Sequence, residues 1–102
     1  MASDLVPGGY TPVENPQSSR MKELAEWAVA EHNKKAGTHL MFIGILTCES
    51  QIVDGVNYRF TLTAKDEKDN CEIESYMAVV FEQPWEHIKE LVYFQKLLLA
   101  EQ

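Results

Sequence analysis

The side chains of this sequence that could carry nucleophilic or metal chemistry are few. They are His32, His39, His87, Cys48 and Cys71. A catalytic cysteine needs a histidine within hydrogen-bond reach, and no such constellation is recognisable here. The cysteine spacing matches no zinc or CxxC pattern, and the GxSxG, HExxH, P-loop and GxGxxG motifs are all missing from the sequence. We therefore expect no enzyme activity, no bound metal and no cofactor.

The two cysteines are predicted to be free thiols. If 40–53 and 56–65 form a hairpin and 71–82 add the next strand, Cys48 and Cys71 lie on strands separated by a third. Strands at that separation are about 9–10 Å apart. A disulfide spans at most roughly 7 Å between Cα atoms. The same cysteines are equally well described as small, half-buried apolar residues.

Two short segments that follow strand-like runs carry apolar side chains where polar residues are usual. They are Gln51-Ile52-Val53-Asp54-Gly55 and Pro84-Trp85. The first segment places two branched apolar residues at a hairpin tip. An exposed tryptophan is a typical interface anchor. Both segments can also be explained without a partner. Asp54-Gly55 is itself a strong hairpin-turn signal, and Trp85 could cover the open end of the core.

These two segments are expected to lie at the same end of the molecule, because two strands and one opposite-end turn separate them in a meander. A glycine pair, Gly8-Gly9, lies in the proline- and glycine-rich start of the chain. We expect residues 1–9 to be a flexible trunk and residues 10–102 to form one domain. Two apolar tips and a glycine pair, without enzymatic side chains, indicate a surface that inserts into a partner.

One amphipathic helix is predicted over residues 17–36. Its apolar stripe is Met21, Leu24, Ala25, Ala28, Val29 and His32. Asn15 or Ser18 can cap its start, and Gly37 can adopt the left-handed conformation that ends it. Because His32 belongs to the stripe, we interpret it as a residue that packs between helix and sheet rather than as a ligand.

The rest of the chain is predicted to form strands. Gly44 within the apolar run 40–46 indicates a bulge or a close backbone approach, and residues 56–64 alternate between apolar and polar. Further strands are expected over 75–81 and from about 91 to 99, with an edge strand around 10–13. The 86–99 segment also fits a helix in part. A single helix laid across a curved antiparallel sheet of four to five strands is the α+β arrangement that buries both apolar faces.

Composition excludes several classes of partner. A chain of 102 residues is long enough for one modest core. Its 9 Lys and Arg residues against 16 Asp and Glu residues argue against a nucleic-acid-binding surface. We expect no membrane partner, because no apolar run approaches the roughly 20 residues of a membrane span. The N-terminus shows no secretory signal, which fits a cytoplasmic protein or the mature form of a secreted one.

Four motifs together resemble the plant cystatins (phytocystatins), which inhibit papain-like cysteine proteases. In chain order they are Gly8-Gly9 with the following 10–16, the helical segment 24–33, the loop 51–55 and Pro84-Trp85. The resemblance implies a cystatin-like fold and reversible, tight-binding inhibition in which the trunk and two hairpin loops block the active-site cleft. The alternative is a cystatin-like interaction or storage module without potent inhibition.

The resemblance also implies which residues contact the protease. They are Gly8, Gly9, Gln51, Ile52, Val53, Asp54, Gly55, Pro84 and Trp85. Two positions depart from the family pattern: Asp54 stands where a small residue is usual, and Trp27 where Phe or Tyr is commoner. We expect a monomer that can also exchange its first half through the 51–55 loop to give a domain-swapped dimer.

Overall fold

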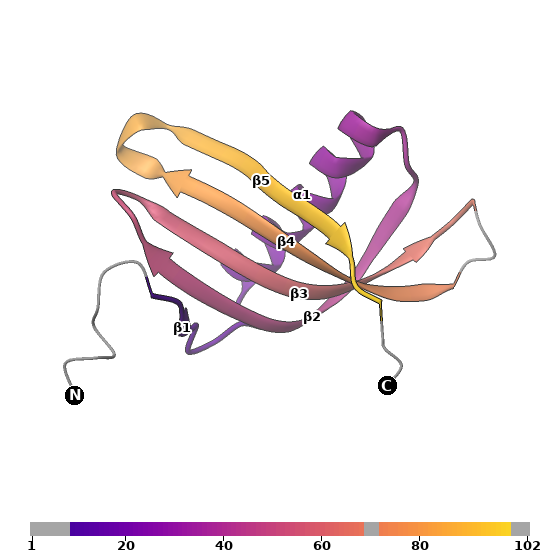
Figure 1. Cartoon of the computed structure of the whole chain (residues 1–102), viewed down its shortest axis with the longest axis horizontal. Coiled ribbons are helices and arrows are strands. Elements are labelled where there is room, and N and C mark those ends of the chain that lie inside the picture. The colour runs from indigo at the N-terminus through magenta and orange to yellow at the C-terminus, as the bar shows by residue number, and fades with distance from the viewer. Residues whose placement is uncertain (1–8, 69–71, 99–102) are drawn as a thin grey trace.

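The computed structural model describes residues 9–68 and 72–98 as one helix packed on one sheet (Figure 1). The elements are β1 (Thr11–Pro12), α1 (Ser19–Ala36), β2 (Leu40–Ile52), β3 (Val56–Asp66), β4 (Ile73–Gln83), the 3-10 turn η2 (Pro84–Glu86) and β5 (Ile88–Lys96). The five strands form an antiparallel sheet in the order β1-β2-β3-β4-β5. The predicted α+β arrangement is confirmed.

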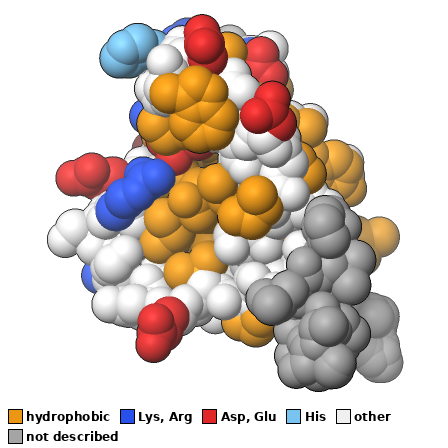
Figure 2. Space-filling view, turned by 90° about the vertical axis from the view of Figure 1, so that its left-hand side faces the viewer, with side chains coloured by type: hydrophobic (Ala, Val, Ile, Leu, Met, Phe, Trp, Pro, Cys, Tyr) orange, Lys and Arg blue, Asp and Glu red, His pale blue; other side chains and the backbone are white. Residues whose placement is uncertain are grey.

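The β2–β3 and β4–β5 connections lie at the same end of the sheet, on the left of Figure 1. Figure 2 looks onto this end and shows apolar side chains between flanking charged ones. The meander therefore brings together the two segments that the sequence singled out, as predicted. Within the described part of the chain, no helix is both long enough and apolar enough to cross a membrane.

Both ends of α1 follow from local sequence. The Ser18 hydroxyl accepts a hydrogen bond from the Met21 backbone N–H at 3.3 Å, which makes Ser18 the N-cap. Gly37 adopts φ 70° and its N–H donates to the Asn33 carbonyl at 2.8 Å. The helix begins two residues later than predicted, because Gln17 belongs to the capping turn and donates its side-chain amide to the Ile45 carbonyl at 2.9 Å.

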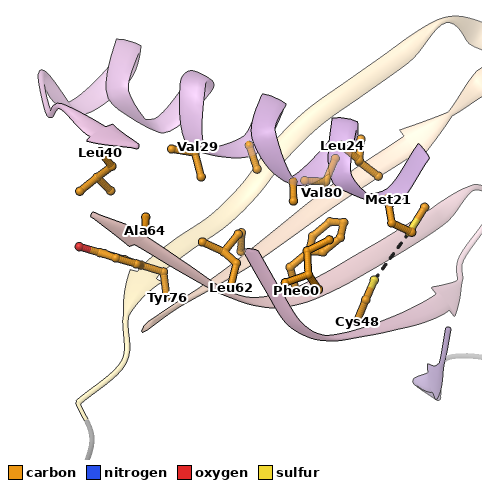
Figure 3. Close-up of a cluster of buried hydrophobic side chains, with 14 residues drawn as sticks. Met21, Leu24, Val29, Leu40, Cys48, Phe60, Leu62, Ala64, Tyr76 and Val80 are labelled. Carbon is orange, nitrogen blue, oxygen red and sulfur yellow. Dashed lines mark hydrogen bonds between the residues drawn. The ribbon is translucent and has the colours of Figure 1, made fainter. Parts of the chain in front are cut away.

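The hydrophobic core lies between α1 and the facing side of the sheet (Figure 3). The buried residues are Met21, Leu24, Ala25, Ala28, Val29, Leu40, Ile45, Cys48, Phe60, Leu62, Ala64, Tyr76, Ala78 and Val80. Every second residue of β3 from Phe60 to Ala64 is buried, as the predicted alternation requires. The core therefore holds the helix and the three central strands together as one support for the loops.

Two irregularities interrupt the pairing of β2 with β3. One lies between Phe42 and Gly44, as predicted, and the other between Ile45 and Thr47. Each inserts an extra residue, and bulged strands bend. The second bulge had no glycine to signal it, so the sequence pattern did not reveal it.

The predicted strand bounds were wrong in three places. The last strand starts at Ile88 rather than near 91, because His87 adopts φ 55° and reverses the chain at once, so that Gln83 pairs with Ile88. It also ends at Lys96. β4 extends two residues beyond the predicted 75–81 at each end. The N-terminal edge strand contains only Thr11–Pro12, where proline has no N–H to donate.

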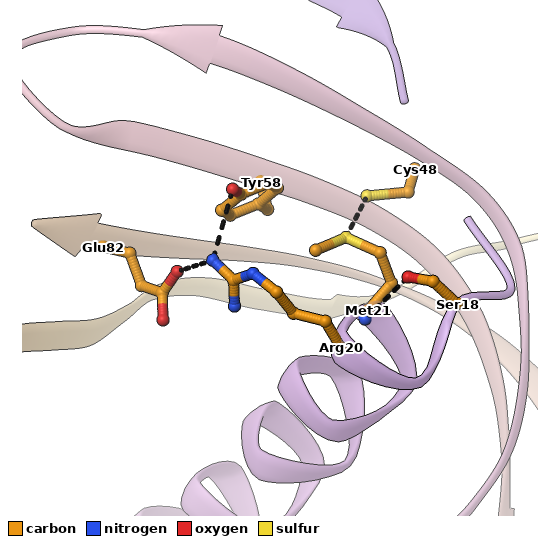
Figure 4. Close-up of polar contacts among 6 residues, drawn as sticks. All are labelled: Ser18, Arg20, Met21, Cys48, Tyr58 and Glu82. Atoms are coloured by element: carbon orange, nitrogen blue, oxygen red, sulfur yellow. Dashed lines mark hydrogen bonds and ion pairs between the residues drawn. The ribbon is translucent and has the colours of Figure 1, made fainter. Parts of the chain in front are cut away.

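Cys48 is a buried free thiol, which confirms the prediction for this residue. Its sulfur lies 3.9 Å from the Met21 sulfur (Figure 4). Burial, together with the neighbouring Glu49 carboxylate, raises the pKa of the Cys48 thiol to about 12. The thiol is therefore protonated at neutral pH and is a packing residue rather than a nucleophile. Cys71 lies outside the described residues.

His32 packs between helix and sheet, as predicted. Its ring stacks on Phe94 of β5 with ring centroids 4.0 Å apart and an interplanar angle of 13°. Burial lowers the pKa of His32 below its usual value of 6.5, because the charged imidazolium loses solvation there. Folding therefore favours the neutral ring, and this contribution to stability is complete above about pH 6.5 and lost as pH falls through the folded-state pKa.

We expect the variant His32→Phe to lack this pH-dependent component while keeping the aromatic contact. The melting temperature of the wild type should fall relative to that of the variant as pH drops from about 7 to about 5. Thermal unfolding followed by circular dichroism at each pH measures the difference. His39→Phe is the control, because His39 is exposed in the turn after α1. A difference that stays constant with pH would contradict the assignment to His32.

Candidate functional site

The β2–β3 connection is a tight hairpin closed by the pair Ile52 and Val56. At its tip Asp54 adopts φ 58° and Gly55 adopts φ 138°, and the Val53 N–H donates to the Gly55 carbonyl at 3.0 Å. Asp and Gly are residues that accept positive φ, so the Asp54-Gly55 turn signal is correct at the level of the backbone. The hairpin nevertheless points two apolar side chains outward.

Gly55 is needed where this hairpin meets β4. A Cβ atom on Gly55 would lie 2.7 Å from the Phe81 ring and 2.8 Å from the Glu82 carbonyl oxygen. Neither distance is compatible with a side chain, and the φ of 138° is one that other residues rarely adopt. The missing side chain of Gly55 therefore allows the first loop, residues 51–55, to pack directly against the end of β4. The contact of Gly55 with a protease stays a prediction.

Gln83 connects the two loops through a hydrogen bond. Its side-chain Nε2 donates a hydrogen bond of 2.7 Å to the backbone carbonyl of Asp54. Gln83 is the last residue of β4 and immediately precedes η2. Gln83 was not predicted from the sequence, because a hydrogen bond between positions 29 residues apart leaves no local pattern.

The loop end exposes four large apolar side chains, which we call the loop surface. They are Ile52 at 69%, Val53 at 36%, Trp85 at 62% and Ile88 at 37% of full exposure. Trp85 therefore does not cover the open end of the core, and that reading of the sequence is wrong. Ile88 was not predicted, because it was assigned to a connecting loop. Apolar side chains gathered at one end in this way are typical of a binding surface.

The second loop is the β4–β5 connection, and its backbone forms the 3-10 turn η2, Pro84–Glu86. Pro84 occupies its first turn, where its fixed φ suits the conformation, and the His87 N–H donates to the Pro84 carbonyl at 3.0 Å. Pro84, Trp85 and Glu86 are all exposed. The turn holds Trp85 on a short, closed segment.

Two further predicted site residues, Gln51 and Gly9, lie in the described part of the chain near the first loop. The Gln51 side-chain oxygen accepts a hydrogen bond of 2.8 Å from the Asn57 amide across the base of the hairpin. Gly9 is exposed, and the pairing of Thr11 with Ser50 directs the preceding residues toward the first loop. Gly8 lies outside the described residues.

An ion pair joins the start of α1 to the end of β4, next to the second loop (Figure 4). Arg20 at the start of α1 donates to Glu82 at 2.6 Å and lies 3.5 Å from the Tyr58 hydroxyl. The Glu82 side chain is only 12% exposed, so the pair connects the helix to the end of β4. Within the described residues, no three His, Cys, Asp or Glu side chains gather closely enough to hold a metal ion.

Comparison with known proteins decides the family. Residues 13–97 match the model of a family described as aspartic acid proteinase inhibitor. The chain is 38% identical over 90 residues to "Cysteine proteinase inhibitor 1" of Actinidia chinensis var. chinensis, covering 88% of this chain and 75% of that protein. It is 41% identical over 97 residues to "Cysteine proteinase inhibitor 1" of Oryza sativa subsp. japonica, covering 93% and 67%. The chain belongs to the plant cystatin family.

The fold of this plant cystatin agrees with a solved structure of the wider group. The crystal structure of salivary cystatin from the soft tick Ornithodoros moubata superposes with a TM-score of 0.77 at 21% identity, covering 91% of this chain and 100% of that one. At this identity the likeness concerns the fold alone. It confirms the cystatin-like arrangement of helix and sheet on which the loops of this plant cystatin stand.

Proposed function

We propose that this plant cystatin is a reversible, tight-binding inhibitor of papain-like cysteine proteases. The observation that carries the proposal is the loop surface, in which Ile52, Val53 and Trp85 stand exposed on two loops joined by Gln83. Relatives that cover most of the chain are named as cysteine proteinase inhibitors. In this proposal the loop surface and the trunk enter the active-site cleft together.

Preorganisation explains how such a surface would bind tightly. The branched side chains of Ile52 and Val53 have few rotamers to lose, and the closed loops lose little backbone freedom. A standard interface of about 1,600 Å² then retains more of its favourable free energy. Gly9, or its neighbour Gly8, would let the trunk approach the protease backbone closely, since glycine has no Cβ. No peptide bond needs to be presented to the catalytic thiolate, so the inhibitor would leave intact.

Inhibition of papain tests the proposal. The protein at nanomolar concentration should abolish hydrolysis of a small fluorogenic peptide, and activity should return on dilution. The recovered inhibitor should have its original mass, because no bond is cleaved. Unchanged papain activity at micromolar inhibitor would reject the proposal and favour the interaction or storage module.

A second candidate function comes from the description of the matching family model. That description names an aspartic acid proteinase inhibitor and covers residues 13–97. An assay of pepsin with the same protein decides between the two. We expect papain to be inhibited and pepsin to be unaffected, because the loop surface contains the loop 51–55 and Pro84-Trp85, two of the motifs that resemble the plant cystatins. Inhibition of pepsin alone would favour the second candidate.

Asp54 is expected to weaken binding modestly. Its carboxylate is exposed at the tip of an otherwise apolar hairpin, and burying an unpaired charge costs free energy. Asp54→Ala should therefore tighten papain inhibition by about threefold. Weaker inhibition by Asp54→Asn as well as by Asp54→Ala would show that the acid is attracted to the imidazolium of the protease.

Asp54→Asn is the matched control for this prediction. Asn accepts the φ of 58° as readily as Asp, whereas Ala is strained there. The backbone carbonyl that bonds Gln83 is also retained. If Asn tightens binding and Ala does not, the charge is unfavourable and the strain on Ala offsets the gain. Inhibition constants of the three proteins, measured in one buffer, separate these effects.

A further inference from the structure

The residue that follows Gly9 is held by a side-chain contact on the sheet. The Arg59 guanidinium carbon lies 3.9 Å from the centre of the Tyr10 ring. Phe60, the next residue of β3, is buried under the helix, so Arg59 points to the opposite, open side of the sheet. The start of the described chain therefore rests on the open side, beside β2 and β3.

Arg59 is itself fixed by a carboxylate. Its Nε donates to a Glu49 oxygen at 2.8 Å, and Glu49 and Arg59 are direct cross-strand partners in β2 and β3. The two side chains are 34% and 35% exposed. A guanidinium that is both ion-paired and stacked is held in one plane, which presents a fixed surface to the Tyr10 ring.

Backbone pairing gives this part of the chain little support by itself. β1 pairs only Thr11 and Pro12 with β2, and Pro12 has no N–H to contribute. The next anchor is the Val13 N–H, which donates to the Cys48 carbonyl at 2.9 Å. Both anchors follow Tyr10 in the chain. The direction in which Gly9 leaves the sheet thus depends on what holds Tyr10.

We infer that Tyr10, Arg59 and Glu49 form a positioning cluster that directs Gly9, the described end of the N-terminal trunk, toward the first loop. The inference rests on the proposed function, in which the trunk is one of three contacts. The cluster lies outside the core, so its loss should leave the fold intact. Its effect should be to order the trunk before binding, which lowers the conformational entropy lost on association.

The free protein provides the first test, because it needs no protease. Backbone ¹⁵N relaxation should show Gly9 and Tyr10 as ordered in the wild type, and as mobile on the picosecond–nanosecond scale in Arg59→Gln and Tyr10→Ala. Tyr10→Phe should behave as the wild type, because it keeps the ring. Arg20→Gln is the matched control, since Arg20 also pairs with a carboxylate but on the other side of the sheet. Unchanged mobility of Gly9 in Arg59→Gln would overturn the inference.

A double-mutant cycle provides the second test. In the full chain, Arg59→Gln should raise the Kd for papain about fivefold. The same substitution should change the Kd less than about twofold when the trunk is blocked by Gly8→Leu together with Gly9→Leu. An equal effect in both backgrounds would show that Arg59 acts through the loops or by direct contact, and would overturn the trunk-positioning role.

The two proposals fail in different ways. A wild type that does not inhibit papain rejects the proposed function, while the relaxation data still decide whether the cluster orders the trunk. If the wild type inhibits papain but the cycle shows no coupling between Arg59 and the trunk, only the positioning role is rejected. Melting temperatures of all variants should lie close to the wild-type value, and a large decrease in Arg59→Gln would assign the cluster to folding instead.

Discussion

Replacing Trp85 with alanine is expected to weaken binding to papain by about 2 kcal/mol or more, roughly 30-fold in Kd. Trp85 is 62% exposed on η2 and is the largest side chain of the loop surface. A central aromatic anchor is lost, so most of the change should appear as faster dissociation. Surface-binding kinetics with immobilised, inactivated papain measure both rate constants. Dissociation at the wild-type rate would contradict the role of Trp85.

The structure offers a matched control for Trp85→Ala. Ile73 is 59% exposed but pairs with Lys65 at the opposite end of the sheet from the loops. Ile73→Ala should therefore leave papain binding unchanged. Because Trp85 contributes little to the core, the melting temperature of Trp85→Ala should also remain close to that of the wild type. Weaker binding together with a large loss of stability would mean that the loop had unfolded rather than lost its anchor.

A domain-swapped dimer is expected to lose papain inhibition almost completely, by at least about 100-fold per chain. If residues 51–55 straighten, β2 continues into β3, and β1, α1 and β2 of one chain pack on β3–β5 of the other. The core contacts are then recovered between chains. The first loop disappears from both copies, together with the bond from Gln83 to the Asp54 carbonyl.

Incubation near the unfolding midpoint, size-exclusion chromatography and a papain assay on each peak test the exchange. Circular dichroism should show the same secondary structure in dimer and monomer. A dimer that inhibits as strongly per chain as the monomer would exclude the 51–55 loop as the hinge.

Asp54 offers a matched pair of hinge variants. At its φ of 58° Asp is tolerated, Gly is favoured and Ala is strained, and each of these differences would disappear in a straight strand. Asp54→Gly accepts the turn at no steric cost and should reduce the dimer fraction, whereas Asp54→Ala should increase it. The expected difference between the two is about 1 kcal/mol in the exchange equilibrium. Equal dimer fractions would show that strain at this residue does not drive the exchange.

Much of the fold could be predicted from the sequence because its signals are local and periodic. The stripe from Met21 to His32, the Ser18 cap and the Gly37 stop specify α1 within two residues at its start. The alternation from Phe60 to Ala64 identified the buried face of β3. The loop 51–55 and Pro84-Trp85 also stood out locally, because apolar residues at a turn break the usual pattern. The position of both segments at one end of the molecule followed from the number of strands between them in a meander.

Contacts between distant residues depended on the tertiary structure alone. Gln83 reaches the Asp54 carbonyl, and Arg59 reaches Tyr10, across 29 and 49 positions of the chain. The close packing of Gly55 against Phe81 likewise depends on how closely β3 and β4 approach each other. Periodicity reveals which face of an element is buried, but not which side chains meet across a register and a turn. The helix, the strands and the two exposed loops could therefore be predicted from local sequence, whereas the contacts that hold the two loops and Tyr10 in place arise only in the packed sheet.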